Sequence, residues 1–257
     1  MDKTIFCFDI DGTLLTFDHR ILDSTIETIQ NIQSQGHKAV IATGRNYGSV
    51  KTTGLLDKIK WDAYVLNNGQ CVLDENFQPI HEETLDQKTI EKIIEVSNRE
   101  GWTCCLETVF YWFTIQEPSE YTIETHRFFN EVCPQKQEYD PSMKIIMAMA
   151  YAPKGYDYAP YKEIEGLTVD PGFSAYADLT KKGCHKYTGI EKCMEYLKCT
   201  KSVCFGDGSN DIDMITLADV GVAMGNAIEE LKEVSDMITD TNEKDGIYHA
   251  IQKLGYL

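Results

Sequence analysis

The sequence predicts an α/β fold, with a parallel-sheet core that both ends of the chain build and an α+β domain inserted between them. Residues 1–82 alternate between short apolar runs and amphipathic helical patterns, and the same alternation returns in residues 182–257. Residues 83–181 instead contain consecutive aromatic, β-prone segments, a pattern typical of an antiparallel sheet packed on helices. We therefore expect two domains, one comprising residues 1–82 and 182–257 and the other residues 83–181.

The first part of the chain contains three apolar runs that indicate strands, over residues 5–8, 39–42 and 64–66. None of these runs alternates with polar residues, as is typical of strands buried on both faces. A helix is expected after the first run, with Ser24 and Glu27 spaced as a capping box at its start and Gly36 at its end. Strands separated by helices predict a parallel sheet with right-handed crossovers.

The middle and the end of the chain differ in their patterns. In the middle we expect helices over residues 86–100 and 120–129, and strands over residues 103–107, 109–115, 144–151 and 166–178, the last a pair that turns at Pro171-Gly172. After residue 181 we expect strands over residues 202–205 and 220–223, and helices over residues 189–197, 211–218, 228–234 and 245–254. The closing segment thus resumes the alternation that predicts the parallel sheet.

The composition limits the classes of function. The 257 residues include 24 basic and 41 acidic residues, and the formal net charge is -17. This charge argues against an extended face for nucleic acid or an anionic membrane, because both need clustered Lys and Arg. No apolar run approaches the roughly 18 residues that span a bilayer, and the first residues do not resemble a signal peptide. The 9 cysteines form no CxxC pair and suit reduced thiols, so we expect a soluble, cytoplasmic protein.

Polar residues follow four of the expected core strands. The four strands end in Asp9-Ile10-Asp11-Gly12-Thr13, Thr43-Gly44-Arg45, Asn67-Asn68-Gly69 and Gly206-Asp207-Gly208-Ser209-Asn210-Asp211, and Lys186 precedes the helix that leads to the last of them. Each piece alone is more often a turn or a solvated side chain. Because the carboxyl ends of parallel strands meet at one edge of a sheet, their occurrence in this order instead favours a shared site.

The residue types at this edge point to a divalent cation and a phosphoryl group. The carboxylates of Asp9, Asp11 and Asp207 would repel one another if bare, and ligands that are all oxygen suit Mg²⁺. The six histidines are scattered, so no zinc cluster is expected. A carboxylate beside Mg²⁺ can attack phosphorus, and its neighbour can give and take the protons. Thr43, Lys186 and main-chain amides can hold the phosphoryl oxygens.

With these motifs the sequence resembles the haloacid dehalogenase-like (HAD) superfamily. Its four motifs are matched by Asp9-Ile10-Asp11-Gly12-Thr13-Leu14, by Thr43, by Lys186 and by Gly206-Asp207-Gly208-Ser209-Asn210-Asp211. The sequence departs from the family pattern at Tyr187, which follows the motif lysine where many relatives have glycine. Lys181 and Lys182 also lie near this position, but the helix that follows Lys186 favours Lys186 as the motif lysine. Asn68-Gly69 and the large insertion after it are similar to the Cof-type sugar-phosphatase branch. The resemblance implies a Rossmann-like core with an inserted α+β cap domain.

The resemblance also implies the activity and the roles of residues. It implies a Mg²⁺-dependent phosphatase that acts on a small phosphorylated metabolite, such as a sugar phosphate, through an aspartyl-phosphate. Asp9 would be the nucleophile and a metal ligand, Asp11 the general acid/base with its main-chain carbonyl on the metal, and Asp207 the third protein ligand. Thr43, Gly44, Lys186 and Asn210 would hold the phosphate or the nucleophile, and Asp211 would bind metal-bound water or orient Lys186.

Two other functions use similar residues. A phosphomutase that forms the same intermediate is an alternative, because it differs only in returning the phosphoryl group to a sugar. A receiver-like signalling module also combines acidic residues, Thr and Lys around Mg²⁺. The paired acids on the first strand and the large insertion disfavour a receiver, because a signalling switch needs neither a cap nor a second acid to turn the intermediate over.

Overall fold

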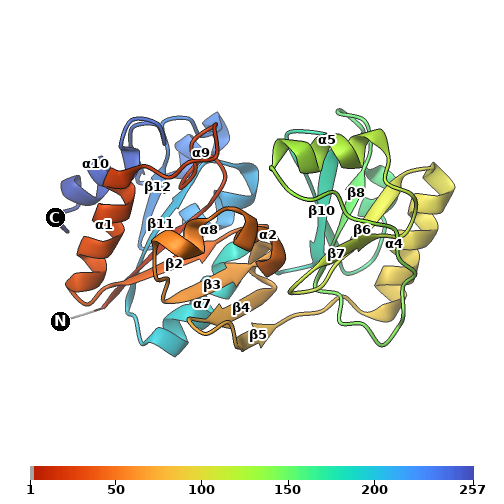
Figure 1. The fold of residues 1–257 in the computed structure, drawn as a ribbon, viewed down its shortest axis with the longest axis horizontal. Coiled ribbons are helices and arrows are strands. Elements are labelled where there is room, and N and C mark those ends of the chain that lie inside the picture. Colours follow the sequence, from red (N-terminus) through yellow and green to blue (C-terminus); the bar gives the residue numbers. More distant parts are fainter. Residues whose placement is uncertain (1–2) are drawn as a thin grey trace. The chain divides into compact units, whose positions relative to one another are not determined.

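The computed structural model describes residues 3–257, which form two compact units (Figure 1). The first unit comprises the chain up to Gly44, Thr53–His81 and His185–Leu257. The second comprises Arg45–Thr52 and Glu82–Cys184. The short segment Arg45–Thr52, which the expected boundaries assign to the first domain, therefore packs with the second unit.

The first unit is built around an eight-stranded sheet with the order β13-β12-β11-β1-β2-β3-β4-β5. Its strands are β1 (Thr4–Phe8), β2 (Lys38–Ala42), β3 (Ala63–Leu66), β4 (Cys71–Asp74), β5 (Pro79–Glu82), β11 (Lys201–Gly206), β12 (Val220–Ala223) and β13 (Met237–Ile238). The strands from β13 to β3 pair in parallel, as predicted. β4 is antiparallel to β3, so the sheet is mixed rather than purely parallel. The tight turn at Asn67–Gly69, with positive φ at Asn68 and Gly69, reverses the chain there.

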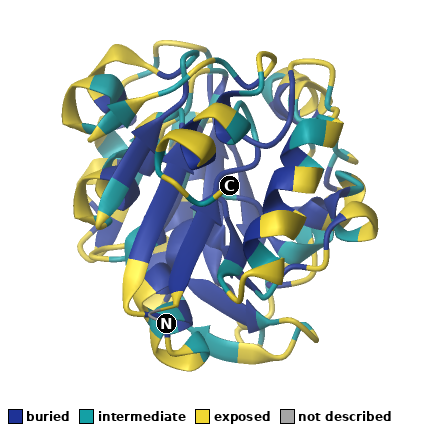
Figure 2. Cartoon of the chain, turned by 90° about the vertical axis from the view of Figure 1, so that its left-hand side faces the viewer, coloured by how far each residue is buried: buried dark blue, intermediate teal, exposed yellow. Residues whose placement is uncertain are grey.

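Helices cover the sheet of the first unit, and Figure 2 shows its buried strands beside helices whose outer faces are exposed. They are α1 (Asp23–Ser34), α3 (Leu55–Lys58), α7 (Lys186–Leu197), α8 (Ile212–Leu217), α9 (Glu229–Val234) and α10 (Gly246–Lys253). Apolar side chains of α7, α8 and α9, among them Ile190, Met214 and Leu231, pack with those of β1, β2, β3 and β11 in one buried cluster. This packing is what holds the ends of these strands in place.

The predicted capping box of the first helix is wrong. α1 begins at Asp23, its N-cap is Leu22, and Ser24 lies inside the first turn. The hydroxyl of Ser24 donates a hydrogen bond of 2.5 Å to Asp245, just before α10, instead of capping its own helix. The Ser24 hydroxyl, which the local pattern predicts to cap α1, thus binds Asp245, a residue distant in the sequence.

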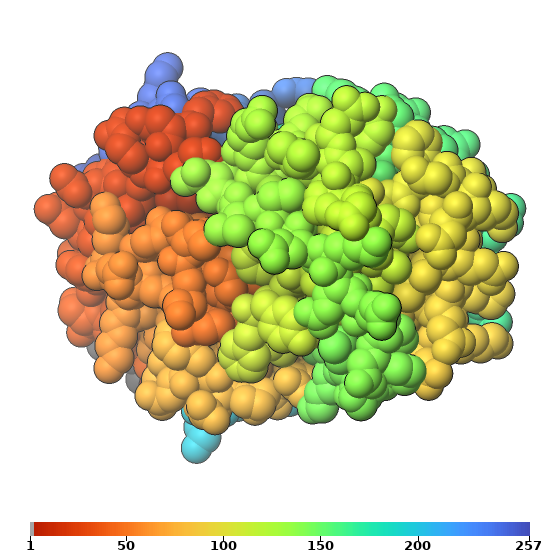
Figure 3. Space-filling view, turned by 45° about the vertical axis from the view of Figure 1, so that its right-hand side comes forward, coloured from red at the N-terminus to blue at the C-terminus, as the bar shows by residue number. Residues whose placement is uncertain are grey.

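The second unit contains a five-stranded antiparallel sheet with the order β7-β6-β8-β10-β9, which confirms the predicted α+β architecture. The strands are β6 (Thr103–Glu107), β7 (Trp112–Thr114), β8 (Met147–Tyr151), β9 (Leu167–Pro171) and β10 (Tyr176–Lys181), and the helices are α2 (Tyr47–Thr52), α4 (Gln87–Glu100), α5 (Glu120–Phe128) and α6 (Ala159–Lys162). Residues of α4 (yellow) and of the segment around α5 (green) are visible on the surface of this unit in Figure 3.

The ends of several elements differ from the expectation. α4 is preceded by its N-cap Asp86, whose side chain accepts a hydrogen bond from the Thr89 amide, and followed by Gly101 with φ of 77°, so its bounds agree with the helix expected over residues 86–100 to within one residue. The strand expected over residues 109–115 is shorter, because the chain turns between Thr108 and Tyr111 before β7. No helix within residues 3–257 is both long enough and apolar enough to cross a membrane. None of the 9 cysteines, all of which lie within residues 3–257, forms a disulfide bond.

Candidate active site

The first unit brings the acidic residues and the lysine of the predicted motifs together. Asp9 follows β1, and its Oδ1 lies 2.6 Å from Nζ of Lys186. The same Nζ lies 2.7 Å from Oδ1 of Asp211. Lys186 is 0% exposed, and it is the first residue of α7, which begins three residues earlier than predicted. One buried ammonium group thus joins the segment after β1 to the segment after β11.

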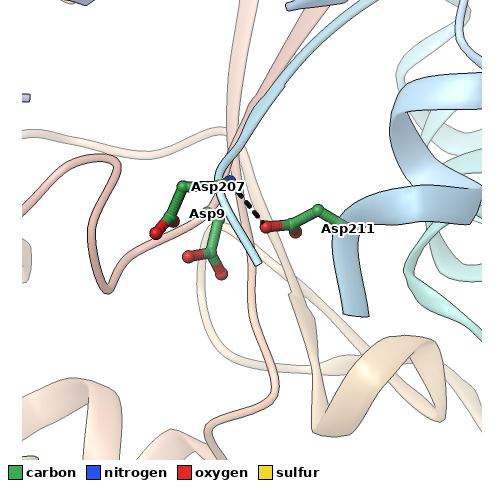
Figure 4. A group of neighbouring side chains, drawn as sticks. All are labelled: Asp9, Asp207 and Asp211. Carbon is green, nitrogen blue, oxygen red and sulfur yellow. Dashed lines mark hydrogen bonds between the residues drawn. The ribbon is translucent and has the colours of Figure 1, made fainter. Parts of the chain in front are cut away.

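Asp211 holds both Lys186 and the loop after β11 in place. Its Oδ2 accepts hydrogen bonds from the amides of Asp207 (2.9 Å) and Gly208 (3.0 Å), the first of which is drawn in Figure 4. Gly206 allows this close approach, because a Cβ there would lie 2.5 Å from Cγ of Asp211. Both carboxylate oxygens of Asp211 are therefore engaged, one with Lys186 and one with the main chain. This geometry suits a residue that orients Lys186 and the loop carrying Asp207.

Asp9, Asp207 and Asp211 form a compact group of carboxylates (Figure 4). One oxygen from each lies within 4.8 Å of the others. Oδ1 of Asp207 accepts a hydrogen bond of 3.1 Å from the hydroxyl of Thr13, which belongs to the first motif. Thr13 was predicted only as part of the motif, so its contact with Asp207 is a finding of the structure.

The loop after β1 folds tightly against Asp207. The amide of Leu14 donates to the carbonyl of Asp9 and that of Leu15 to the carbonyl of Ile10, at 3.2 and 2.9 Å. Gly12 has φ of 81°, and a Cβ there would lie 2.1 Å from Oδ2 of Asp207. Only glycine meets both requirements without strain. Asp11, which precedes Gly12, is half-buried in this loop.

The remaining predicted residues form a second linked group. The amide of Thr43 donates to the carbonyl of Val65, and the carbonyl of Thr43 accepts from the amide of Asn68, at 2.9 and 3.1 Å. Gly44 lies close to the same side chain, because a Cβ there would be 3.1 Å from Oδ1 of Asn68. That oxygen accepts a hydrogen bond of 3.0 Å from Nδ2 of Asn210. Asn68 thus connects residues predicted to hold phosphate, a role that its position after a strand did not reveal.

The site contains more carboxyl groups than cations among Asp9, Asp207, Asp211 and Lys186. Burial raises the pKa of Asp9 to about 7, and it does so against the attraction of Lys186 and with added repulsion from Asp211 and Asp11. Burial, followed by repulsion from Asp9 and Asp211, raises the pKa of Asp207 to about 9. Burial alone would lower the pKa of Lys186, but Asp211 and Asp9 outweigh it and raise that pKa above its usual value. The ammonium therefore stays charged, while the carboxyl groups of Asp9 and Asp207 resist ionisation.

A divalent cation with a preference for oxygen would relieve this imbalance. Asp9 and Asp207 each have one oxygen, Oδ2, that makes no hydrogen bond to the residues described here. All donors are oxygens, which fits Mg²⁺. Asp211 fits direct ligation less well, because its two oxygens are already engaged. The cluster can therefore hold a cation between Asp9, whose Oδ1 Lys186 fixes, and Asp207.

Comparisons with known proteins agree with this geometry. The family model for haloacid dehalogenase-like hydrolases matches residues 6–251. The protein YkrA of Bacillus subtilis is 30% identical over 266 residues, with 100% of both chains covered. The 5-amino-6-(5-phospho-D-ribitylamino)uracil phosphatase YcsE of the same organism is 27% identical, with 98% of this chain and 96% of YcsE covered. The solved structure of the HAD subclass IIB sugar phosphatase BT4131 aligns with a TM-score of 0.89 and 28% identity, covering 99% of this chain and 100% of that one. The chain therefore belongs to the haloacid dehalogenase-like hydrolases of Cof type and is a phosphatase that acts on phosphate monoesters.

Proposed function

We propose that the protein hydrolyses small phosphomonoesters, sugar phosphates or related metabolites, with Mg²⁺ and through a phosphorylated Asp9. The observation that carries the proposal is the environment of Asp9. Its carboxylate is buried, Lys186 holds Oδ1 at 2.6 Å, and Asp207 lies beside it. A carboxylate that is buried and fixed in this way is oriented for attack on phosphorus.

Asp9 and Asp207 are the side chains that would hold Mg²⁺, together with the main-chain carbonyl of Asp11. Asp211 would contribute indirectly, by holding Lys186 and the loop of Asp207. When bound, Mg²⁺ neutralises the clustered carboxylates and the phosphoryl oxygens, so that two anions can approach each other.

The residues of the chain account for each bond that forms and breaks. In the first step an oxygen of Asp9 attacks phosphorus, the bond from phosphorus to the alcohol oxygen breaks, and Asp11 gives that oxygen a proton. In the second step Asp11 takes a proton from water, and the water oxygen attacks phosphorus. The bond from phosphorus to the oxygen of Asp9 breaks, which releases inorganic phosphate and restores the carboxylate of Asp9. Lys186, Thr43, Gly44 and Asn210 hold the phosphoryl oxygens while charge spreads over them.

The second unit, which includes residues 83–181, is proposed to act as the cap that selects the substrate. The motifs of the first unit account for phosphoryl transfer but carry nothing that distinguishes one alcohol from another. BT4131 is a sugar phosphatase, and YcsE is a 5-amino-6-(5-phospho-D-ribitylamino)uracil phosphatase. Both align along nearly the whole of this chain, the second unit included. This likeness supports a small, polyhydroxylated phosphate ester as the substrate.

A screen of phosphorylated metabolites tests the proposal. Purified protein is incubated with each compound in Mg²⁺ or in chelator, and the released inorganic phosphate is measured. We expect release from one or a few sugar or sugar-alcohol phosphates in Mg²⁺, and none in chelator or with the Asp9→Asn variant. An isomeric sugar phosphate as the product, without inorganic phosphate, would indicate a phosphomutase. Equal activity in chelator would contradict the role of the metal.

A further inference from the structure

The turn after β12 joins the two loops that supply the acidic residues of the site. Nδ2 of Asn226 donates a hydrogen bond of 2.8 Å to the carbonyl of Gly12, in the loop after β1. Two residues later, the amide of Ile228 donates to the carbonyl of Asp207, in the loop after β11, at 3.0 Å. A single short segment therefore fixes the main chain of both loops.

Both ends of the Asn226 amide are engaged, which defines its orientation. Its Oδ1 accepts a hydrogen bond of 3.0 Å from the amide of Asn242. The side chain of Asn242 is buried, and its Nδ2 donates at 2.7 Å to the carbonyl of Leu15. The two asparagines thus hold the start and the end of the loop segment from Gly12 to Leu15.

Gly12 has almost no room to move between its two neighbours. On one side its carbonyl is held by Asn226, and on the other its Cα lies against the carboxylate of Asp207. Asp11 precedes Gly12 in the chain, and Thr13, which follows it, donates its hydroxyl hydrogen bond to Asp207. A shift of the Gly12 peptide would therefore displace the proposed acid/base on one side and the contact with a proposed metal ligand on the other.

We propose that Asn226 is a positioning residue for phosphoryl transfer, which acts by holding the Gly12 peptide so that Asp11 and Thr13 keep their places relative to Asp207. Asn226 lies outside the four motifs, and this inference rests on the proposed function for its effect on catalysis. Displacements of about 1 Å in a reacting group lower rates by about 100-fold, so the loss of this hydrogen bond should act on turnover more than on folding.

Two substitutions of Asn226 and one control test the proposal. Asn226→Ala removes both hydrogen bonds of the side chain. Asn226→Asp keeps the acceptor for Asn242 but loses the donor and places an anion against the Gly12 carbonyl. The control is Gln33→Ala, because Nε2 of Gln33 also donates to a main-chain carbonyl, that of Lys60 at 2.8 Å, in the connection between β2 and β3. Gln33 holds no catalytic loop, so its variant should keep the activity of the wild type.

Two readouts separate positioning from folding. The first is hydrogen–deuterium exchange of peptides covering residues 9–16, which should be faster in both Asn226 variants and unchanged in Gln33→Ala. The second is the kinetics with p-nitrophenyl phosphate, normalised to folded protein. We expect kcat to fall by about 10- to 100-fold in the Asn226 variants, with KM within about threefold of the wild-type value.

Unchanged exchange in residues 9–16, or unchanged kcat in Asn226→Ala, would overturn the proposal. So would a loss of activity that disappears after correction for unfolded protein, because that loss is the signature of a purely structural role. A wild-type protein without phosphatase activity would contradict the proposed function instead, while the exchange data would still decide whether Asn226 holds the loop.

Discussion

Replacing Asp9 with asparagine should abolish turnover and, at the same time, stabilise the metal-free protein at neutral and alkaline pH. Asp9 is 6% exposed and lies beside Asp207 and Asp211. Burial raises its pKa from the ordinary value of 3.8 to about 7, although Lys186 opposes the change. The folded protein therefore resists ionisation of Asp9, whereas the unfolded chain does not. The nearly isosteric amide removes this unfavourable charge along with the proposed nucleophile.

The size and the pH range of the effect follow from that pKa. Below about pH 4 the carboxyl group is protonated in both states, so it carries no penalty. Between about pH 4 and pH 7 only the unfolded chain releases the proton, so the free energy of unfolding falls as the pH rises. Above about pH 7 the penalty is constant, with an upper bound of roughly 4 kcal/mol for the difference between 3.8 and about 7. Since the amide also weakens the contact with Lys186, we expect a net gain of about 1–3 kcal/mol.

Thermal unfolding in chelator, followed by circular dichroism from pH 4.5 to pH 8.5, measures this gain. Asp9→Asn should melt several degrees above the wild type at pH 8, and the difference should shrink toward pH 4.5. Asp62→Asn is the control, because Asp62 pairs with Lys38 at 2.7 Å outside the cluster, so its variant should show no gain. Saturating Mg²⁺ should stabilise the wild type and narrow the gap. An Asp9→Asn protein no more stable than the wild type at pH 8, or equally stabilised at pH 4.5, would refute the reasoning.

Three further predictions concern the acid/base, the metal and the second unit. Asp11→Asn should lower kcat on alkyl phosphates by roughly 100-fold or more. It should slow the first step on aryl phosphates less, because an aryl leaving group needs no proton. Equal losses in the pre-steady-state rates on both substrate types would count against Asp11 as the acid/base. Ca²⁺ should support little activity in steady-state assays, because it is larger and tends to bind carboxylates through both oxygens, so comparable rates with the two ions would argue against a Mg²⁺-like site. Arg45→Ala should lower the free energy of unfolding by up to about 3–5 kcal/mol in urea titrations, because the buried carboxylate of Glu131 loses the guanidinium that lies 2.7 Å away and is left with His126 and Ser49. A loss below about 1 kcal/mol would contradict this. Burial alone would raise the pKa of Glu131, but the contacts with His126, Arg45 and Ser49 outweigh burial and hold this pKa below its usual value. The stability that Glu131 contributes is therefore fully present above the ordinary pKa of a glutamate. It is lost as the pH falls through the lowered pKa of the folded protein.

The core strands and the first and fourth motifs could be predicted because each leaves a local signal. Apolar runs without alternation mark β1, β2, β3 and β11, and polar residues with glycines follow each of them. The carboxyl ends of parallel strands then bring these residues together with no further information. Lys186, Asp9 and Asp211 are in contact as this rule predicts, although 177 and 25 residues separate Lys186 from its two partners along the chain.

Other features depend on contacts that no local pattern records. α7 begins earlier than its sequence pattern predicts, because its first turn precedes the apolar stripe that begins at Ile190. The sequence pattern does not predict β4, because the reversal at Asn67–Gly69 depends on positive φ values rather than on hydrophobicity. Asn226 lies 214 residues from Gly12 and belongs to a turn, so only the folded chain shows that its side chain reaches the loop after β1.

Chemical trapping of the phosphorylated residue tests the central claim most directly. The Asp11→Asn variant, whose intermediate should break down slowly, is mixed with an aryl phosphate in Mg²⁺, quenched in acid and treated with borohydride, which reduces an aspartyl-phosphate to homoserine. Peptide mass spectrometry then locates the modified residue. We predict homoserine in place of Asp9 in the peptide containing residues 4–16, and none in chelator. Turnover without any modified residue, or modification at a residue other than Asp9, would contradict the account.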